Sequence, residues 1–230
     1  MLHTHSKTHP AIADWFTEGL GKPEIDAILS KATIRRFWAK EIIFRSGDLA
    51  KHLYLLRMGS VKFYRVSHDG HEVVLGWLMP GEIFGLGTLL PAHRLNYLGT
   101  AEPLNDCEAY VRDAACIRRL EISYPGLAAN CLRISLHYVA QFAERHISLA
   151  SYSVEERLAH TLTELGDRAG HATPGGVEVN VKNEQLASLA DINYFTTSRL
   201  LNKWQRMGAV KKSRGKILIE CPEKLLIEMP

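Results

Sequence analysis

The sequence predicts an α+β protein with an N-terminal antiparallel β jelly roll (a double-stranded β-helix), one long helix, and a small C-terminal domain of helices and a hairpin. Three observations support this fold class: evenly spaced glycine turns in the first half, a long stretch of helical periodicity, and two short helical segments before a final hairpin. The 230 residues are 46% apolar and 23% charged, enough to bury two modest cores. We expect domain boundaries at residues 1–124, 125–153 and 154–230.

The jelly roll is predicted from about Thr33 to Val111, after short helical stretches within residues 11–31. Its segments are rich in Val, Ile, Phe and Tyr. Turn glycines separate them at intervals of 11 or 12 residues, at Gly47, Gly59, Gly70 and Gly81. This spacing is typical of a meander of short strands. The Asp69-Gly70 pair favours a tight hairpin, because a type I′ turn needs a positive φ at both central positions.

The long helix is predicted to begin at Pro125, because proline suits a first helical turn and apolar residues recur at helical spacing beyond it. One line along it consists of Cys131, Ile134, Tyr138, Phe142, Arg145, Leu149 and Tyr152. A second line consists of Leu132, Leu136, Val139, Ala143, His146 and Ala150. Two lines indicate two partners, the roll on one side and another helix on the other.

The long helix is therefore predicted to form the seam of a homodimer. The residues assigned to this dimer interface are Cys131, Ile134, Tyr138, Val139 and Phe142. The alternative is a helix that lies wholly inside the core of a monomer.

The C-terminal domain is predicted to begin with a helix over residues 154–168, followed by a break at GHATPGG and a short strand near residues 177–181. Two further helices are expected over residues 183–190 and 194–207, and two short strands flank a turn at residues 213–215. A helix, a tight turn, an amphipathic basic helix and a hairpin, in this order, are typical of a winged helix-turn-helix.

Charge is concentrated in this last domain. The whole chain carries a net charge of only +3, but the segment from Ile192 to Ile219 contains no Asp or Glu. Its basic residues are Arg199, Lys203, Arg206, Lys211, Lys212, Arg214 and Lys216. The distribution therefore predicts an anion-binding module near one end of the chain.

Both halves of the sequence resemble the Crp/Fnr superfamily of bacterial transcription regulators. Residues 41–90 and 100–111 resemble its cyclic-nucleotide-binding-type roll, and residues 183–210 with 214–219 resemble its winged helix. The resemblance spans about Lys22 to Glu220. It implies a homodimeric, sequence-specific transcription regulator in the cytoplasm, with double-stranded DNA of a near-palindromic site as its partner. RNA polymerase is a candidate further partner.

The same resemblance assigns DNA contacts. In the family the second helix of the motif lies in the major groove, and Arg199 stands where an arginine reaches a guanine or a nearby phosphate. Phe195 stands where the family commonly has a glutamate, and Thr196 and Thr197 suit phosphate contacts. The full candidate set is Asn193, Tyr194, Phe195, Thr196, Thr197, Arg199, Lys203, Lys212, Arg214 and Lys216.

The residues that hold a cyclic nucleotide phosphate in the family are replaced. Leu86 stands where a carboxylate accepts from the ribose, Tyr97-Leu98 replaces an Arg-Ser pair, and Phe142 replaces a base contact on the long helix. We therefore expect a regulator that does not respond to cAMP, since a buried phosphate would lack its charged partners. The expected pocket is apolar and lined by Leu75, Gly85, Leu86, Gly87, Tyr97, Leu98 and Phe142.

Two alternatives to this function stay open. A shift of the loop could bring Arg94 into the pocket and restore a cyclic-nucleotide response. The chain could also be a ligand-binding signalling module with a non-standard pocket and no DNA partner, although the intact winged helix argues against it.

Other chemistries are not supported by the sequence. The N-terminus has no cysteine, which argues against an iron–sulfur cluster, and the four cysteines form no CxxC pair. His68 and His71 lie across a hairpin turn, so they do not make a metal site. The sequence contains neither a nucleophile–base pair nor a cofactor motif. We therefore predict that the protein binds no metal and no cofactor and is not an enzyme. Without a signal peptide or an apolar run of about 20 residues, a cytoplasmic protein with no membrane partner is expected.

Overall fold

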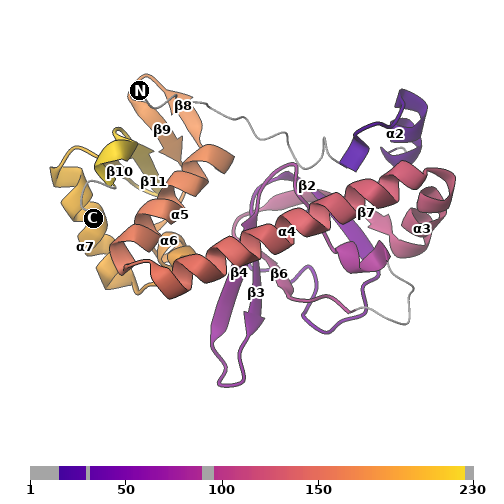
Figure 1. Cartoon of the computed structure of the whole chain (residues 1–230), viewed down its shortest axis with the longest axis horizontal. Coiled ribbons are helices and arrows are strands. Elements are labelled where there is room, and N and C mark those ends of the chain that lie inside the picture. The colour runs from indigo at the N-terminus through magenta and orange to yellow at the C-terminus, as the bar shows by residue number, and fades with distance from the viewer. Residues whose placement is uncertain (1–15, 30–31, 90–95, 226–230) are drawn as a thin grey trace. The chain divides into compact units, whose positions relative to one another are not determined.

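The computed structural model describes residues 16–29, 32–89 and 96–225 (Figure 1). It confirms the predicted α+β class, with a β roll, a long helix and a winged helix-turn-helix. The chain divides into two compact units, and the boundary between them falls inside the long helix, between Phe142 and Ala143. The last turns of that helix thus group with the C-terminal unit, whereas the sequence predicts a separate segment over residues 125–153.

The N-terminal unit contains two antiparallel sheets. Their strands are β1 (Thr33–Phe37), β2 (His52–Met58), β3 (Val61–Val66), β4 (Glu72–Leu78), β5 (Ile83–Phe84), β6 (Thr100–Pro103) and β7 (Cys107–Asp113). One sheet has the order β1-β7-β2-β5 and the other β4-β3-β6. The short 3-10 helix η1 (Leu86–Leu89) follows β5.

The turn glycines Gly47, Gly59, Gly70 and Gly81 all have positive φ, but Asp69 does not, so the β3–β4 turn is not the type I′ turn expected from Asp69-Gly70. Gly70 has a φ of 86° in the projecting β3–β4 hairpin. Gly59 has a φ of 87°, and a Cβ atom placed there would lie 2.6 Å from the Cβ of Cys107. Only glycine fits at this position, because both the backbone angle and the close approach of β7 exclude a side chain.

Aromatic rings fill the space between the two sheets. Phe44 stacks on Tyr97 with ring centroids 3.7 Å apart, and Tyr54 stacks on Phe84 at 4.9 Å. These four residues belong to one buried cluster that also includes Phe37. Phe44 also lies tilted against Tyr54 and Phe84, with ring centroids 5.6 and 6.0 Å apart. Tilted ring pairs add to the stabilisation that comes from burying their area.

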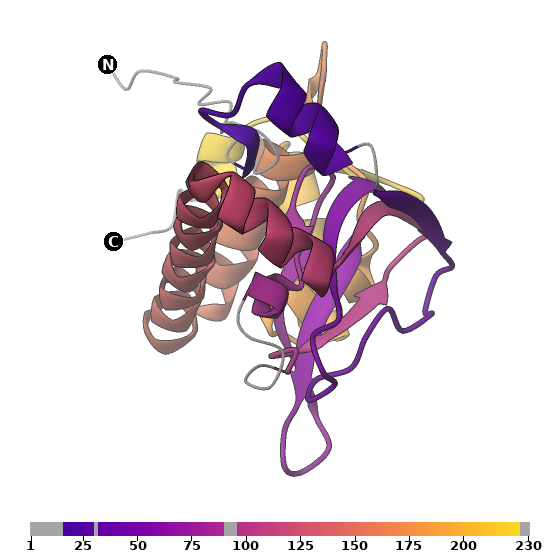
Figure 2. The same cartoon turned by 90° about the vertical axis from the view of Figure 1, so that its right-hand side faces the viewer.

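A second apolar cluster lies on the outer side of the roll, under helices α2 (Lys22–Leu29), α3 (Ala114–Ser123) and α4 (Pro125–Ser151). Figure 2 shows these helices beside the strands of the roll. The cluster consists of Phe16, Ile28, Leu53, Ile83, Ile117, Leu127, Cys131 and Ile134.

The long helix α4 has 27 residues, and its two apolar lines have different surroundings. Cys131 and Ile134 are buried against the roll, and the Tyr138 hydroxyl donates to the Ile83 carbonyl at 2.7 Å. Two of these predicted dimer residues, Cys131 and Ile134, are corrected to core residues because their side chains are already buried within one chain, whereas Tyr138 is half-buried. The other line is exposed: Leu132, Leu136 and Val139 are 62%, 60% and 61% exposed.

The C-terminal unit has a small core under a four-stranded sheet. Its elements are α5 (Val154–Ala169), β8 (His171–Thr173), β9 (Gly176–Val179), α6 (Asn183–Ala190), α7 (Tyr194–Arg206), β10 (Val210–Ser213), β11 (Lys216–Ile219) and the 3-10 helix η2 (Pro222–Leu225). The sheet order is β10-β11-β9-β8. The GHATPGG segment, predicted to be a break, instead forms β8 and a tight turn into β9, and the pairing of β8 with β9 completes the sheet.

Helix α5 begins with a capping box. The Ser153 hydroxyl accepts from the Glu156 amide, and the Glu156 carboxylate accepts from the Ser153 amide at 2.6 Å. These bonds lower the pKa of Glu156 and stop α4 from continuing into α5. Among the described residues, no helix has both the length and the apolar content that crossing a bilayer requires.

Candidate DNA-binding surface and effector pocket

The turn of the helix-turn-helix covers residues 191–193, between α6 and α7. Asp191 ends α6 in the left-handed conformation, with a φ of 53°. Asn193 caps α7, because its side-chain oxygen accepts a hydrogen bond from the Thr196 amide at 2.8 Å. This bond satisfies one of the donors that a helix leaves free in its first turn. The Asn193 side chain, predicted to contact DNA, therefore also fixes the start of α7.

Helix α7 has one buried face and one exposed face. Its buried residues are Thr197, Leu200, Leu201 and Trp204. The exposed stripe contains Phe195, Arg199, Asn202 and Arg206, at helical spacing. Phe195 is 81% exposed, and Tyr194 lies edge-on to it with ring centroids 5.7 Å apart. The stripe can therefore present an aromatic ring, two guanidinium groups and an amide to a ligand.

Two predicted DNA contacts on α7 are engaged within the protein. Thr197 is buried, and its hydroxyl donates to the Asn193 carbonyl at 3.1 Å, so it has no surface to offer a phosphate. The Lys203 ammonium lies 3.1 Å from the Glu155 carboxylate of α5. The Trp204 indole N–H donates to the same carboxylate at 3.2 Å. These contacts fasten α7 to α5. Thr196 remains at the surface, half-buried.

The wing between β10 and β11 carries the other predicted cations. The Lys216 ammonium pairs with Glu178 at 2.6 Å, and the Lys212 ammonium donates to the Asn202 side chain. Arg214 is exposed at the tip, next to Gly215 with its φ of 74°. Within the part of the chain that the structure describes, neither Arg199 nor Arg214 makes an ion pair, so both guanidinium groups are available to an anion.

The residues predicted to form the effector pocket do not all lie together, although Gly85 lies against Tyr97: a Cβ at Gly85 would be 3.4 Å from Cε1 of that ring. Leu86 packs against the outer cluster, whereas Tyr97 belongs to the cluster between the sheets. Leu98 is 69% exposed, and Phe142 is exposed as well. Leu75, Gly85 and Gly87 are half-buried. Arg94 lies outside the described residues.

Tyr97 closes the interior of the roll. Its hydroxyl accepts from the His52 amide and donates to the His52 carbonyl, each at 3.0 Å, while its ring stacks on Phe44. Burial raises the pKa of Tyr97, and it also raises that of Tyr54, so both phenols are neutral near pH 7. Tyr97, which the resemblance places where a cationic phosphate ligand is expected, is thus a neutral ring packed into the core.

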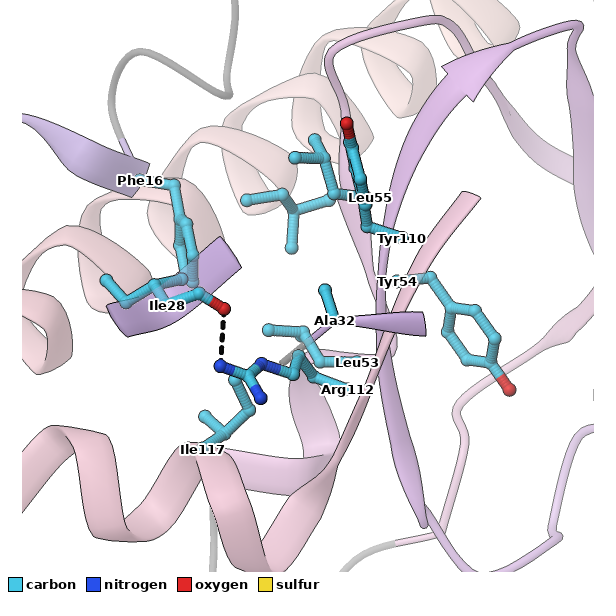
Figure 3. A pocket seen from close by; sticks show the side chains of 10 residues that line it. Phe16, Ile28, Ala32, Leu53, Tyr54, Leu55, Tyr110, Arg112 and Ile117 are labelled. Atoms are coloured by element: carbon cyan, nitrogen blue, oxygen red, sulfur yellow. Dashed lines mark hydrogen bonds between the residues drawn. The ribbon is translucent and has the colours of Figure 1, made fainter. Parts of the chain in front are cut away.

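A different pocket opens on the outer side of the roll, under α2 (Figure 3). It is a shallow, half-open pocket, lined mostly by apolar side chains around Arg112. The Arg112 guanidinium donates to the Ala27 carbonyl at 2.8 Å and to the Ile28 carbonyl. These acceptors lie at the C-terminal end of α2, where a cation is favoured. We therefore interpret Arg112 as an anchor for α2.

Sequence reasoning missed Arg112, because an arginine in an alternating strand is normally an outward-facing residue. It also missed Arg157, although it did place Arg145 on an otherwise apolar line of the long helix. An isolated charge at such a position is a signal of a buried partner.

Two family models match the chain: the cyclic nucleotide-binding domain over residues 34–123 and the Crp-like helix-turn-helix domain over residues 156–226. The chain is 32% identical to the cyclic AMP receptor protein of Thermus thermophilus over 215 residues. The matched residues make up 91% of this chain and 93% of that protein. This chain belongs to the Crp/Fnr family.

Other Crp/Fnr relatives are more distant. The fumarate and nitrate reduction regulatory protein of Escherichia coli is 23% identical over 187 residues, covering 80% of this chain and 74% of that protein. The structure of FixK2 from Bradyrhizobium japonicum has the same fold, with a TM-score of 0.75 at 18% identity over 84% of this chain and 95% of that one. Crp/Fnr proteins are transcription regulators with a helix-turn-helix DNA-binding domain, not enzymes.

Proposed function

We propose that this Crp/Fnr protein is a homodimeric, sequence-specific DNA-binding regulator that reads its site with α7 and does not respond to cAMP. The observation that carries the proposal is the exposed stripe of α7, where Phe195 and Arg199 face outward from a well-packed core. The stripe lies in a segment without a single acidic residue, so nothing in that segment repels a phosphate backbone.

Direct readout would come from the first turns of α7. Arg199 is one turn into the helix, where an unpaired guanidinium can bond bidentately to O6 and N7 of guanine. Phe195 can contact a thymine methyl group but offers no hydrogen-bond acceptor. Arg214 at the tip of the wing and the first-turn Thr196 would contact phosphates, which fixes register without reading sequence.

Dimerisation would use the exposed line of α4. Leu132, Leu136 and Val139 are followed by Ala143, His146 and Ala150, so the spacing alternates between four and three residues. This is the a/d spacing of a coiled coil, and a second copy of the same helix is the partner that matches it. A two-fold dimer would read two half-sites about one helical turn apart. RNA polymerase remains a candidate further partner.

The absence of a cAMP response is argued from two positions. A nucleotide phosphate entering the roll would meet the buried Tyr97 ring, which supplies no charge to compensate its desolvation. Leu86, which packs against the outer cluster, offers no carboxylate to a ribose hydroxyl. The 32% identity to a protein named cyclic AMP receptor favours the second candidate, a cyclic-nucleotide-responsive regulator.

The test is selection of binding sites from random DNA by the full-length protein, with and without 1 mM cAMP as the added probe. We expect one enriched, near-palindromic site that is the same in both conditions, and no heat of cAMP binding by calorimetry. Failure to enrich any sequence would contradict DNA reading by α7. Enrichment only with cAMP would instead support the second candidate.

A further inference from the structure

The C-terminal end of α6 is held by two arginines from elsewhere in the C-terminal unit. The Arg145 guanidinium, in the last turns of α4, donates to the Leu189 carbonyl at 2.6 Å. The Arg157 guanidinium, in the first turn of α5, donates to the Ala190 carbonyl at 3.3 Å and the Asp191 carbonyl at 3.4 Å. Three successive carbonyls that a helix end leaves without partners are thus satisfied by cationic donors.

These carbonyls lead directly into the turn of the helix-turn-helix. Asp191 has a φ of 53°, in the left-handed region that aspartate adopts more readily than most residues other than glycine and asparagine. Asn193, two residues later, caps α7. The direction in which α7 leaves the turn therefore depends on backbone that the two arginines hold.

The arginines also tie the turn to the junction between α4 and α5. Arg157 donates a further hydrogen bond to the Tyr152 carbonyl at 3.2 Å, just before the capping residue Ser153. Arg145 is half-buried, and the loss of solvation lowers its pKa despite the favourable charges of Asp191 and Glu164. No carboxylate in the described ranges of the chain makes a hydrogen bond or ion pair with the Arg145 guanidinium, so its bond to the Leu189 carbonyl compensates for the lost solvation.

We propose that Arg145 and Arg157 are positioning residues for DNA recognition, which hold the turn at residues 191–193 so that α7 presents its exposed stripe in one orientation. This inference rests on the proposed function, because it assigns the residues that orient the recognition helix. Neither arginine contacts DNA in this scheme; each acts through the backbone of the turn.

The two arginines are expected to differ in how well a lysine can reproduce their hydrogen bonds. Arg145 makes a single bond to one carbonyl, and one ammonium donor can reproduce it. Arg157 spans the carbonyls of Tyr152, Ala190 and Asp191 with three different nitrogens, a geometry that the compact ammonium of lysine cannot match.

The experiment measures the ratio of affinities for the selected site and for a scrambled site. For Arg145→Met, Arg157→Met and Arg157→Lys we expect the ratio to fall about tenfold, the size expected for losing one charge-assisted hydrogen bond. Arg145→Lys should stay within about twofold of the unmodified protein. The matched control is Arg168→Met, which removes an arginine from the other end of α5, where it pairs with Glu164.

Hydrogen exchange of the unbound protein gives a second readout that does not depend on DNA. Amides of residues 192–197 should exchange faster in the Met variants, while amides of β11 in the wing keep their protection. An unchanged affinity ratio in Arg157→Met, or an equal loss of protection throughout the C-terminal unit, would overturn the proposal. If the unmodified protein itself prefers no sequence, the proposed function fails and this inference fails with it. If it selects a site that Arg157→Met reads equally well, only this inference fails.

Discussion

At the scale of single residues, the exposed guanidinium groups of α7 and the wing have different surroundings. Arg199 lies on the helix stripe with Phe195, whereas Arg214 lies at the tip of a β-turn. We expect Arg199→Ala to cost about 1–3 kcal/mol on the selected site and to relax the preference at one base pair. We expect Arg214→Ala to weaken binding to all DNA sequences alike. The slope of log affinity against log salt concentration should also become smaller by about one per half-site.

Salt titrations of both variants on the selected and scrambled sites check these two expectations. Equal losses on both sites for Arg199→Ala would make that residue a backbone contact, and specificity would then have to come from other groups or from DNA shape.

Phe195 is the second residue whose chemistry predicts a measurable preference. A phenyl ring cannot accept a hydrogen bond from a cytosine or adenine amine, so the preferred half-site should differ from that of relatives with a glutamate at this position. The Phe195→Glu variant should move the preference at that base pair towards cytosine or adenine. Repeating the site selection with this variant measures the shift, and an identical selected site would show that Phe195 is not at the interface.

The Cys107 thiol connects burial with pH-dependent stability. Burial, with Glu41 and Asp106 nearby, raises the pKa of Cys107 to about 11, above its ordinary value of 9.0. As the pH rises, the unfolded chain loses the Cys107 proton before the folded state does. The stability that the protonated thiol contributes is therefore complete below pH 9 and is lost as the pH rises towards 11. Between pH 8 and pH 10, the free energy of unfolding measured by urea titration should fall by about 1 kcal/mol more in the unmodified protein than in Cys107→Ala. Equal losses in the two proteins would contradict the buried, protonated thiol.

At the scale of elements, α4 supplies a matched pair of positions on its two faces. Ile134 is buried against the roll, whereas Val139 is exposed on the a/d line. We expect Val139→Asp to dissociate the dimer, because the carboxylates introduced in the two protomers would repel each other across the coiled-coil seam. The fold should stay intact, because Val139 is exposed within one chain. We expect Ile134→Asp to lower the free energy of unfolding by several kcal/mol, because it buries a charge without a partner.

Sedimentation velocity and thermal unfolding of both variants separate the two effects. A Val139→Asp protein that still sediments as a dimer would place the interface on another surface. An Ile134→Asp protein as stable as the original would contradict the burial of this face against the roll.

At the scale of the whole molecule, a two-fold dimer requires its half-sites to lie on one side of the duplex. We expect an insertion of about 5 base pairs between the half-sites, half a helical turn, to reduce binding to that of one half-site. The affinity of the native site, the lengthened site and an isolated half-site can be compared in one mobility-shift series. Undiminished binding to the lengthened site would show that the two halves are read independently.

The sequence by itself determined the order and nature of most elements, with the exceptions of α3 and β8. Glycine spacing located the strand meander, helical periodicity located α4, and the acid-free segment located the winged helix, because each of these signals depends on local backbone geometry and solvation. The replacement of charged nucleotide ligands by Leu86 and Tyr97 was also readable from the sequence. Such local features need no knowledge of which distant segments meet.

Only the tertiary structure decided which face of an element finds a partner. The sequence placed Cys131 and Ile134 at a dimer seam, but the roll covers them and leaves the line through Val139 exposed. Thr197 was predicted to contact phosphate, yet it is buried. The bonds of Arg145 and Arg157 to the end of α6 join residues 33 to 44 positions apart in the chain. Periodicity reveals that a face is apolar or charged, but burial is decided by the segments that pack against it, and these lie far away in sequence.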